Sequence, residues 1–171
     1  MEFLTSIKNS IPDYAKDIRL NVDSTIARSS LEGNDAVGVA LAAAFATKNK
    51  TLVDLIKNSG NITPEEVHAA LTAAALMGMN NVWYPFVEMA DDEQLKGLPA
   101  QLRMNAIASH GGTTKARLEA YSLAASIVGK CHFCVKAHYD TLKKEGYTVE
   151  QLRDIGRIAA VIVSVARVVA N

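Results

Sequence analysis

The amino-acid sequence predicts an all-α fold. Alternating apolar and polar residues, which are typical of half-buried strands, are absent, and clusters of β-branched residues are few. Alanine, the residue with the highest helix propensity, is abundant. We therefore expect helices nearly throughout the 171 residues, a length that suits one domain with a sizeable core or two small similar halves.

The N-terminal third is expected to hold short helices followed by a buried one. Pieces broken at Pro12 should pack on the body as an arm over residues 1–30. Asn34 is expected to cap a helix running to Ala46, and this helix is small and apolar almost all round, as buried helices are. A further helix is expected from Thr51 to Asn58.

The middle of the chain begins with a strong helix-start signal. Thr63 suits the N-cap, Pro64 the first turn, and Glu66 the third position of a capping box. The helix should continue toward Glu88, and acidic residues after it mark an exposed connection. Pro99 is expected to open another helix through Leu102 and Ile107.

The last third is expected to contain three helices. The loop at 111–114 should cap the first, and Gly129 should interrupt the backbone so that Cys131 starts the second. Thr148 and Gln151 predict a capping box for the third, which runs to Ala170. This final helix is apolar on more than one face, so we expect it to be deeply buried or to contact another subunit.

We expect a single all-helical domain over residues 1–171. Setting Gly78 on Gly129 aligns two halves, roughly 34–95 and 96–171, as a pseudo-repeat. Chance matches are frequent in an alanine-rich chain, so the alignment carries little weight by itself.

Composition and charge exclude several classes of partner. The formal net charge is zero and no long run of one sign occurs, which argues against nucleic acid or an anionic membrane surface as the main partner. The N-terminus lacks a basic segment followed by an apolar one, and the apolar runs are too short to span a bilayer. A cytoplasmic protein is the expectation, and a lone cysteine pair there is more often catalytic or metal-binding than structural.

The chemistry of the chain is concentrated in residues 131–138. This segment holds both cysteines and two of the four histidines. On a helix, Cys131, Cys134 and His138 fall within roughly 60° of arc, and α-carbons three residues apart lie within reach of a disulfide.

Three interpretations of this cluster remain open from spacing alone. The residues could fill a helical core, since free cysteines are often buried and inert. They could supply three ligands of a structural zinc site, with His68, His110 or an acid as the fourth. The favoured interpretation is thiol redox chemistry, which needs a close cysteine pair beside a base.

An acid that orients the base would complete such a site. A helix N-terminus, Lys130 and His138 all favour the thiolate, and histidine acts best as a base when a carboxylate orients it. Glu119 is the nearest candidate, although it lies in an apolar stretch and could instead point to water.

Glu119 is followed by eleven residues and Cys131, then by two residues and Cys134, then by three residues and His138. This spacing resembles the signature of the alkylhydroperoxidase D family, within the wider carboxymuconolactone decarboxylase-like group. The resemblance extends over essentially the whole chain. It includes the segments 11–21, 77–82 and 102–105.

The resemblance implies an all-helical antioxidant protein, commonly a homotrimer. By that match Cys134 attacks the peroxide, Cys131 resolves the sulfenic acid to a disulfide, and Glu119 with His138 forms the proton relay. The electron donor would be dihydrolipoamide on a lipoyl-bearing acyltransferase, recharged by dihydrolipoamide dehydrogenase, with no tightly bound cofactor and no metal. The family can also pass electrons to a partner peroxiredoxin.

One departure from the family concerns the residue before the second cysteine. Well-known members have histidine there, and this chain has Phe133, with His132 one residue earlier on a different side of the helix. We therefore expect His132 to be a surface or cap residue.

Taken together, the sequence predicts a lipoyl-dependent alkyl hydroperoxide reductase with a dithiol–disulfide cycle. The alternative is a thiol–disulfide adaptor that passes electrons from dihydrolipoamide to a peroxiredoxin. A Cys/His metal-binding domain is a third class. A thioredoxin-like fold is disfavoured because no strand–helix–strand pattern accompanies the pair, and a decarboxylase is weaker still.

Overall fold

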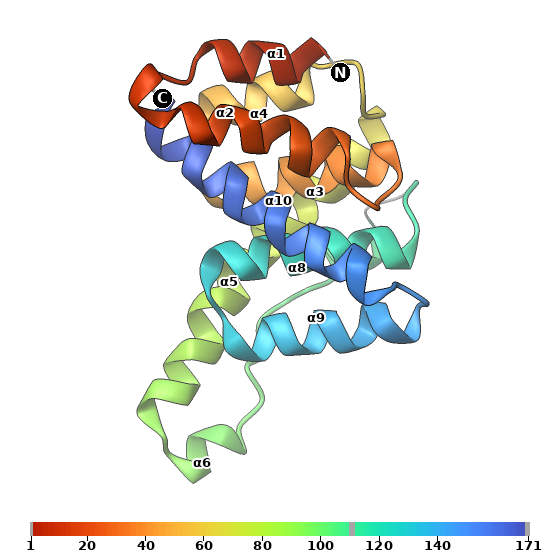
Figure 1. Ribbon diagram of the computed structural model, residues 1–171. Coiled ribbons are helices and arrows are strands. Elements are labelled where there is room, and N and C mark those ends of the chain that lie inside the picture. Colours follow the sequence, from red (N-terminus) through yellow and green to blue (C-terminus); the bar gives the residue numbers. More distant parts are fainter. Residues whose placement is uncertain (1, 110–111, 170–171) are drawn as a thin grey trace.

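The computed structural model describes residues 2–109 and 112–169, and these residues form helices and no strand (Figure 1). The prediction of an all-α fold is confirmed. The elements are α1 (Glu2–Asn9), η1 (Asp13–Ala15), α2 (Lys16–Val22), η2 (Asp23–Ala27, a π-helical turn), α3 (Gly33–Ala46), α4 (Lys50–Lys57), α5 (Pro64–Ala90), α6 (Glu93–Lys96), α7 (Ala106–Ser109), α8 (Lys115–Gly129), α9 (His132–Lys144) and α10 (Val149–Val168).

Helix α3 is the centre of the core. It packs against α5, α8 and α10, and its residues from Asp35 to Ala44 are buried on every side, as its small apolar sequence predicts. Gly38 allows α8 to approach closely, because a Cβ atom there would lie 2.4 Å from the ring of Tyr121. The predicted cap is wrong: α3 begins at Gly33, so Asn34 lies inside the first turn and Glu32 is the N-cap residue, without a side-chain hydrogen bond.

The N-terminal segment packs on the body, as predicted. Its helices break around Pro12, where η1 begins, and bury Phe3, Ile7 and Val22 in the core. Asp154 on α10 fastens the end of this segment by accepting hydrogen bonds from the Ser30 backbone N–H (2.8 Å) and hydroxyl (2.9 Å).

The helix-start signals are mostly confirmed. Thr63, Thr114 and Thr148 each accept a backbone N–H at the start of α5, α8 and α10, and Thr148 forms the predicted capping box with Gln151. The capping box predicted for Glu66 is wrong. Its carboxylate turns into the protein and accepts hydrogen bonds from other side chains instead.

The helix predicted from Pro99 through Leu102 and Ile107 is also wrong. Residues 97–105 form no helix, and the predicted segment is helical only from Ala106 to Ser109. Gln101 has a φ of 52°, and one left-handed residue of this kind interrupts the α-helical hydrogen-bond series.

The end of α5 extends beyond the body together with α6 (Figure 1). This part of the chain exposes large apolar side chains to solvent. They are Val82, Phe86, Met89, Leu98 and Leu102. Single exposed apolar residues are ordinary, but several along one projection mark a surface suited to contact.

Helix α10 buries one long face against α3, α8 and α2, which includes Leu152, Ile155, Ile158, Ile162 and Val165. Deep burial therefore accounts for much of its apolar character. Among the described residues, no helix is both long enough and apolar enough to cross a membrane. The division into repeats at 34–95 and 96–171 stays a prediction.

Candidate active site

The start of α9 positions the two cysteines. Lys130 ends α8 in the left-handed conformation, with a φ of 56°, and Cys131 becomes the N-cap residue of α9. The sulfur of Cys131 accepts the backbone N–H of Cys134 at 3.2 Å. The predicted new helix start at Cys131 is confirmed, and it places the positive end of a helix dipole beside this sulfur.

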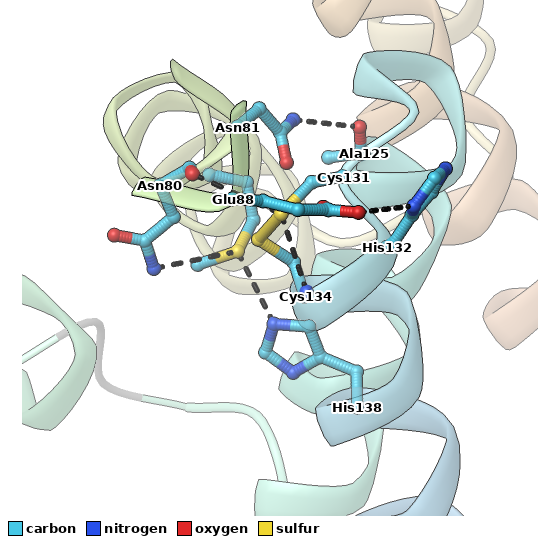
Figure 2. Close-up of a disulfide and its surroundings, with 9 residues drawn as sticks. Asn80, Asn81, Glu88, Ala125, Cys131, His132, Cys134 and His138 are labelled. Carbon is cyan, nitrogen blue, oxygen red and sulfur yellow. Dashed lines mark hydrogen bonds and ion pairs between the residues drawn. A yellow bond between two sulfur atoms is a disulfide. The ribbon is translucent and has the colours of Figure 1, made fainter. Parts of the chain in front are cut away.

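Cys131 and Cys134 are joined by a disulfide, with their α-carbons 5.3 Å apart (Figure 2). The exposed fraction is 0% for Cys131 and 3% for Cys134. The pair is therefore a disulfide placed just beneath the surface.

His138 and Glu119 lie beside the pair. Nδ1 of His138 is 2.7 Å from Oε2 of Glu119, which joins α9 to α8. The two side chains are 17% and 23% exposed, respectively. Figure 2 shows the imidazole on the same side of α9 as the disulfide. Glu119 thus pairs with the histidine instead of pointing to water, and the four residues predicted for the site lie together.

Helix α5 supplies a third side of the site that sequence reasoning missed. The sulfur of Met77 is 3.2 Å from Nε2 of His138, and the backbone carbonyl of Asn80 lies 3.8 Å from the sulfur of Cys131. Two signals were available: segment 77–82 belongs to the family resemblance, and Ala70, Ala73 and Met77 have core-facing spacing along the helix. These signals predict burial and family membership, but neither identifies His138 or Cys131 as the neighbour.

Asn81 fixes the distance between α5 and the end of α8. Its amide donates to the carbonyl of Ala125 at 3.0 Å (Figure 2). A Cβ atom on Gly129 would lie 2.1 Å from the same amide nitrogen. Gly129 is therefore required for close approach at this point, just before the cysteines.

The two residues between the cysteines point away from the disulfide. His132 is exposed and pairs with Glu88 at 3.0 Å. Phe133 stacks on Tyr84 with ring centroids 4.1 Å apart. This geometry places His132 on the surface, as predicted, and joins the start of α9 to the projecting end of α5.

The arrangement does not form a metal centre in the part of the chain that the structure describes. No group of three or more His, Cys, Asp or Glu side chains in residues 2–109 and 112–169 is placed to hold an ion. His68 lies on α5, and His110, the other histidine considered as a zinc ligand, lies outside the described residues.

A groove of about 520 Å³ borders the first cysteine. Cys131 forms part of its lining, together with the apolar side chains Ile127 and Val135, the aromatic Tyr139, and the polar or charged Lys130, His132, Lys136 and Asp140.

Comparison with known proteins gives a consistent result for the whole chain. Residues 93–170 match the Carboxymuconolactone decarboxylase family. A protein named alkyl hydroperoxide reductase AhpD from Coxiella burnetii (strain Dugway 5J108-111) is 40% identical over 170 residues, covering 96% of each chain. The chain belongs to the alkylhydroperoxidase D family.

Two further relatives in this family carry the same name. The one from a Bradyrhizobium species is 41% identical over 165 residues, covering 95% of this chain and 91% of the relative. The one from Rhodospirillum centenum is 40% identical over 167 residues, covering 96% and 89%. The resemblance stated from the signature is therefore confirmed at the level of the family.

Proposed function

We propose that this protein is a thiol peroxidase that reduces alkyl hydroperoxides through a Cys131–Cys134 dithiol–disulfide cycle. The observation that carries the proposal is the buried disulfide with the Glu119–His138 pair beside it. The names of the relatives support the class of substrate.

The oxidising half-reaction begins at Cys134. Glu119 orients His138, which accepts the proton of the Cys134 thiol, and the thiolate attacks the outer oxygen of the hydroperoxide. The O–O bond breaks, Cys134 becomes a sulfenic acid, and the alkoxide takes up a proton to leave as the alcohol.

Cys131 then resolves the sulfenic acid. Its sulfur attacks the sulfur of Cys134 and the disulfide forms. The hydroxyl group of the sulfenic acid takes up a proton and leaves as water. The N–H of Cys134 and the helix N-terminus favour the thiolate form of Cys131, so the two sulfurs receive different support. The assignment of Cys134 as the attacking residue follows the family resemblance, and the variants described below test it.

Dihydrolipoamide is proposed as the electron donor, without a tightly bound cofactor. Both sulfurs are almost fully buried, so a reductant must reach them as a narrow arm, and the apolar part of the groove beside Cys131 suits an alkyl chain. We propose a lipoyl-bearing acyltransferase as carrier, with dihydrolipoamide dehydrogenase to recharge it, in the cytoplasm.

A closed homotrimer is proposed for the assembly. The apolar side chains on the projecting end of α5 and the following segment would be covered by a neighbouring subunit. Because Glu119, Cys131, Cys134 and His138 belong to one chain, each subunit would carry a complete redox pair. Light scattering over a dilution series should give three times the chain mass, and a fully active monomer at high concentration would contradict the proposal.

The decisive experiment is a peroxidase assay with dihydrolipoamide supplied and then withheld. With the donor we expect repeated turnover, and without it we expect one peroxide consumed per cysteine pair and loss of both alkylatable thiols by mass analysis. If both thiols stay alkylatable after peroxide, the cycle is wrong. Slow consumption that becomes fast only when a peroxiredoxin is added would favour the adaptor function.

A further inference from the structure

Both ring nitrogens of His138 face atoms that can only accept hydrogen bonds. Nδ1 lies 2.7 Å from Oε2 of Glu119, and an ionised carboxylate has no hydrogen to donate. Nε2 lies 3.2 Å from the sulfur of Met77, and a thioether has none either. If either ring nitrogen were unprotonated, its lone pair would therefore point at another hydrogen-bond acceptor, with no donor to pair with.

The Met77 sulfur is held firmly in this position. The residue is 1% exposed and lies on the core face of α5. The side-chain amide of Asn80, one turn later, contacts the same sulfur at 3.9 Å. The backbone carbonyl of Asn80 also contacts Cys131, so this turn of α5 touches both the imidazole and the disulfide.

We propose that Met77 is a positioning residue of the redox site. In the disulfide form its thioether accepts a hydrogen bond from Nε2–H of His138. It thereby keeps on the ring the proton that Cys134 takes up when the disulfide is reduced. The inference rests on the proposed dithiol–disulfide cycle and adds a residue to it.

The reduction step balances as follows. The first thiol of the dithiol loses its proton to solvent and attacks Cys131, the S–S bond breaks, and Cys134 departs as a thiolate that takes the Nε2 proton. The second thiol loses its proton to solvent and attacks the mixed disulfide, so that Cys131 departs and takes a proton from solvent. Two electrons pass from the dithiol to the cysteine pair, and the pair takes one proton from His138 and one from solvent. The ring is then free to accept the Cys134 proton in the oxidising half-reaction.

The weakness of the thioether as an acceptor matters for this role. A carboxylate at the position of Met77 would form a charge-assisted hydrogen bond about twice as strong as a neutral one and would hold the Nε2 proton. A sulfur acceptor aligns the N–H but competes poorly with a thiolate formed beside it. Met77 can thus fix the ring in the disulfide form and release the proton in the reduced form.

The first test uses the unaltered oxidised protein. Nitrogen-15 NMR of the His138 ring at pH 7 reports directly whether each nitrogen carries a hydrogen. We expect both nitrogens to be protonated, with the Nε2 hydrogen protected from exchange. A ring with an unprotonated Nε2 would overturn the proposal, and this result does not depend on any peroxidase activity.

The second test is Met77→Leu, which keeps the size and apolar character of the side chain and removes the acceptor. We expect the rate of disulfide reduction by dihydrolipoamide to fall about threefold to tenfold, as loss of one modest hydrogen bond predicts. Oxidation of the reduced protein by peroxide should change less than twofold. The Nε2 hydrogen should exchange faster, while the melting temperature stays close to that of the parent.

The matched control is Met79→Leu, the same substitution two residues along α5, where the side chain projects from a different face of the helix. It should leave both half-reactions unchanged. Equal slowing of both half-reactions in Met77→Leu would indicate packing alone, and an unchanged reduction rate would remove Met77 from the mechanism. Either outcome contradicts the proposal without touching the proposed peroxidase function.

Discussion

Two carboxylates near α8, Glu66 and Glu119, have different surroundings. Glu66 on α5 is buried and accepts hydrogen bonds from Thr113, Arg117 and Tyr121. Glu119, on α8 itself, pairs with the His138 imidazole and is 23% exposed. One carboxylate is surrounded by fixed donors, and the other is paired with a group that exchanges protons.

The difference in partners distinguishes a structural carboxylate, Glu66, from Glu119, the carboxylate of the proposed relay. Arg117 also pairs with Asp35 at 2.6 Å, so Glu66 belongs to a closed network. Burial, together with Glu66, raises the pKa of Tyr121 well above its usual range, so this hydroxyl stays a donor. A relay needs a partner whose charge changes near neutral pH, and histidine is the side chain suited to that. The number and kind of partners, more than burial, distinguish the two sites.

The largest expected effect comes from the cysteines. Cys134→Ser should abolish peroxide consumption, because it removes the attacking thiolate. Cys131→Ser should react once and then stop as a sulfenic acid, which a dimedone-type reagent would trap for mass analysis. The reverse pattern would show that the attacking and resolving cysteines are exchanged.

The next effect tests the comparison directly. Glu119→Gln keeps the shape of the side chain and removes its charge, so the peroxide reaction should slow by about 10² to 10⁴, the usual contribution of a positioned acid–base group. Stopped-flow kinetics would measure this rate. Activity within about twofold of the parent would place Glu119 outside the mechanism.

The matched control is Glu66→Gln, the same chemical change on the other side of α8. Here we expect a loss of about 1–3 kcal/mol in the free energy of unfolding, since three donors lose a charged acceptor. The rate per folded molecule should be unchanged. Urea denaturation and active-site titration of the same samples would separate the two effects.

Asp154 is another carboxylate with fixed hydrogen-bond donors, and its pKa predicts how the stability of the protein depends on pH. Burial alone would raise its pKa, but hydrogen bonds from Ser30, Arg157 and Arg153 lower it to about 2, against 3.8 for an ordinary aspartate. A lowered folded-state pKa stabilises the protein above the unfolded-state value, and this stabilisation is lost as the pH falls from about 4 to about 2. It amounts to about 2 kcal/mol, at 1.36 kcal/mol per unit.

Asp154→Asn should therefore be less stable than the parent at pH 7, with a difference that narrows between about pH 4 and pH 2. Denaturation curves over this range would measure it. Asp35 has the opposite effect on the pH dependence of stability, because burial raises its pKa. As the pH falls, protonation removes part of the cost of burying its charge. A difference between the Asp154→Asn variant and the parent that stays constant with pH would contradict the assignment.

The smallest expected effect is that of His132→Ala. The side chain is exposed and its pairing with Glu88 lies on the surface, where ion pairs contribute little. Peroxidase rate should stay within about twofold of the parent and the melting temperature within a degree or two. A loss of tenfold or more would give His132 a role in the relay that this geometry does not support.

Most of the fold could be predicted because its signals are local. Thr63 and Thr148 precede their helices by the spacing that capping requires, and both caps form. The failure at Pro99 has a different cause. Proline suited a first helical turn, but the chain returns there from the projecting end of α5 to the body, and the left-handed turn at Gln101 depends on that path.

The site was predictable where one stretch of chain carries it. The spacing of Glu119, Cys131, Cys134 and His138 placed four residues on two consecutive helices. Met77 is 61 residues from His138, and their contact depends on how α5 packs against α9. The sequence predicted that Glu66 caps its own helix, because it does not reveal that Arg117 and Tyr121 lie close enough to donate hydrogen bonds to this carboxylate.

Helix α5 fixes the rotation of the candidate active-site residues relative to the Glu66 network. Glu66 and Met77 are eleven residues apart, close to three full turns, so both face the interior from one helix. A single residue inserted between them would rotate everything beyond it by about 100°. Such an insertion would turn Met77 away from His138 and Asn81 away from Ala125 while Glu66 kept its partners. Relatives in which this redox site is built in the same way should therefore keep the interval between these two positions free of insertions and deletions, even where its residues change.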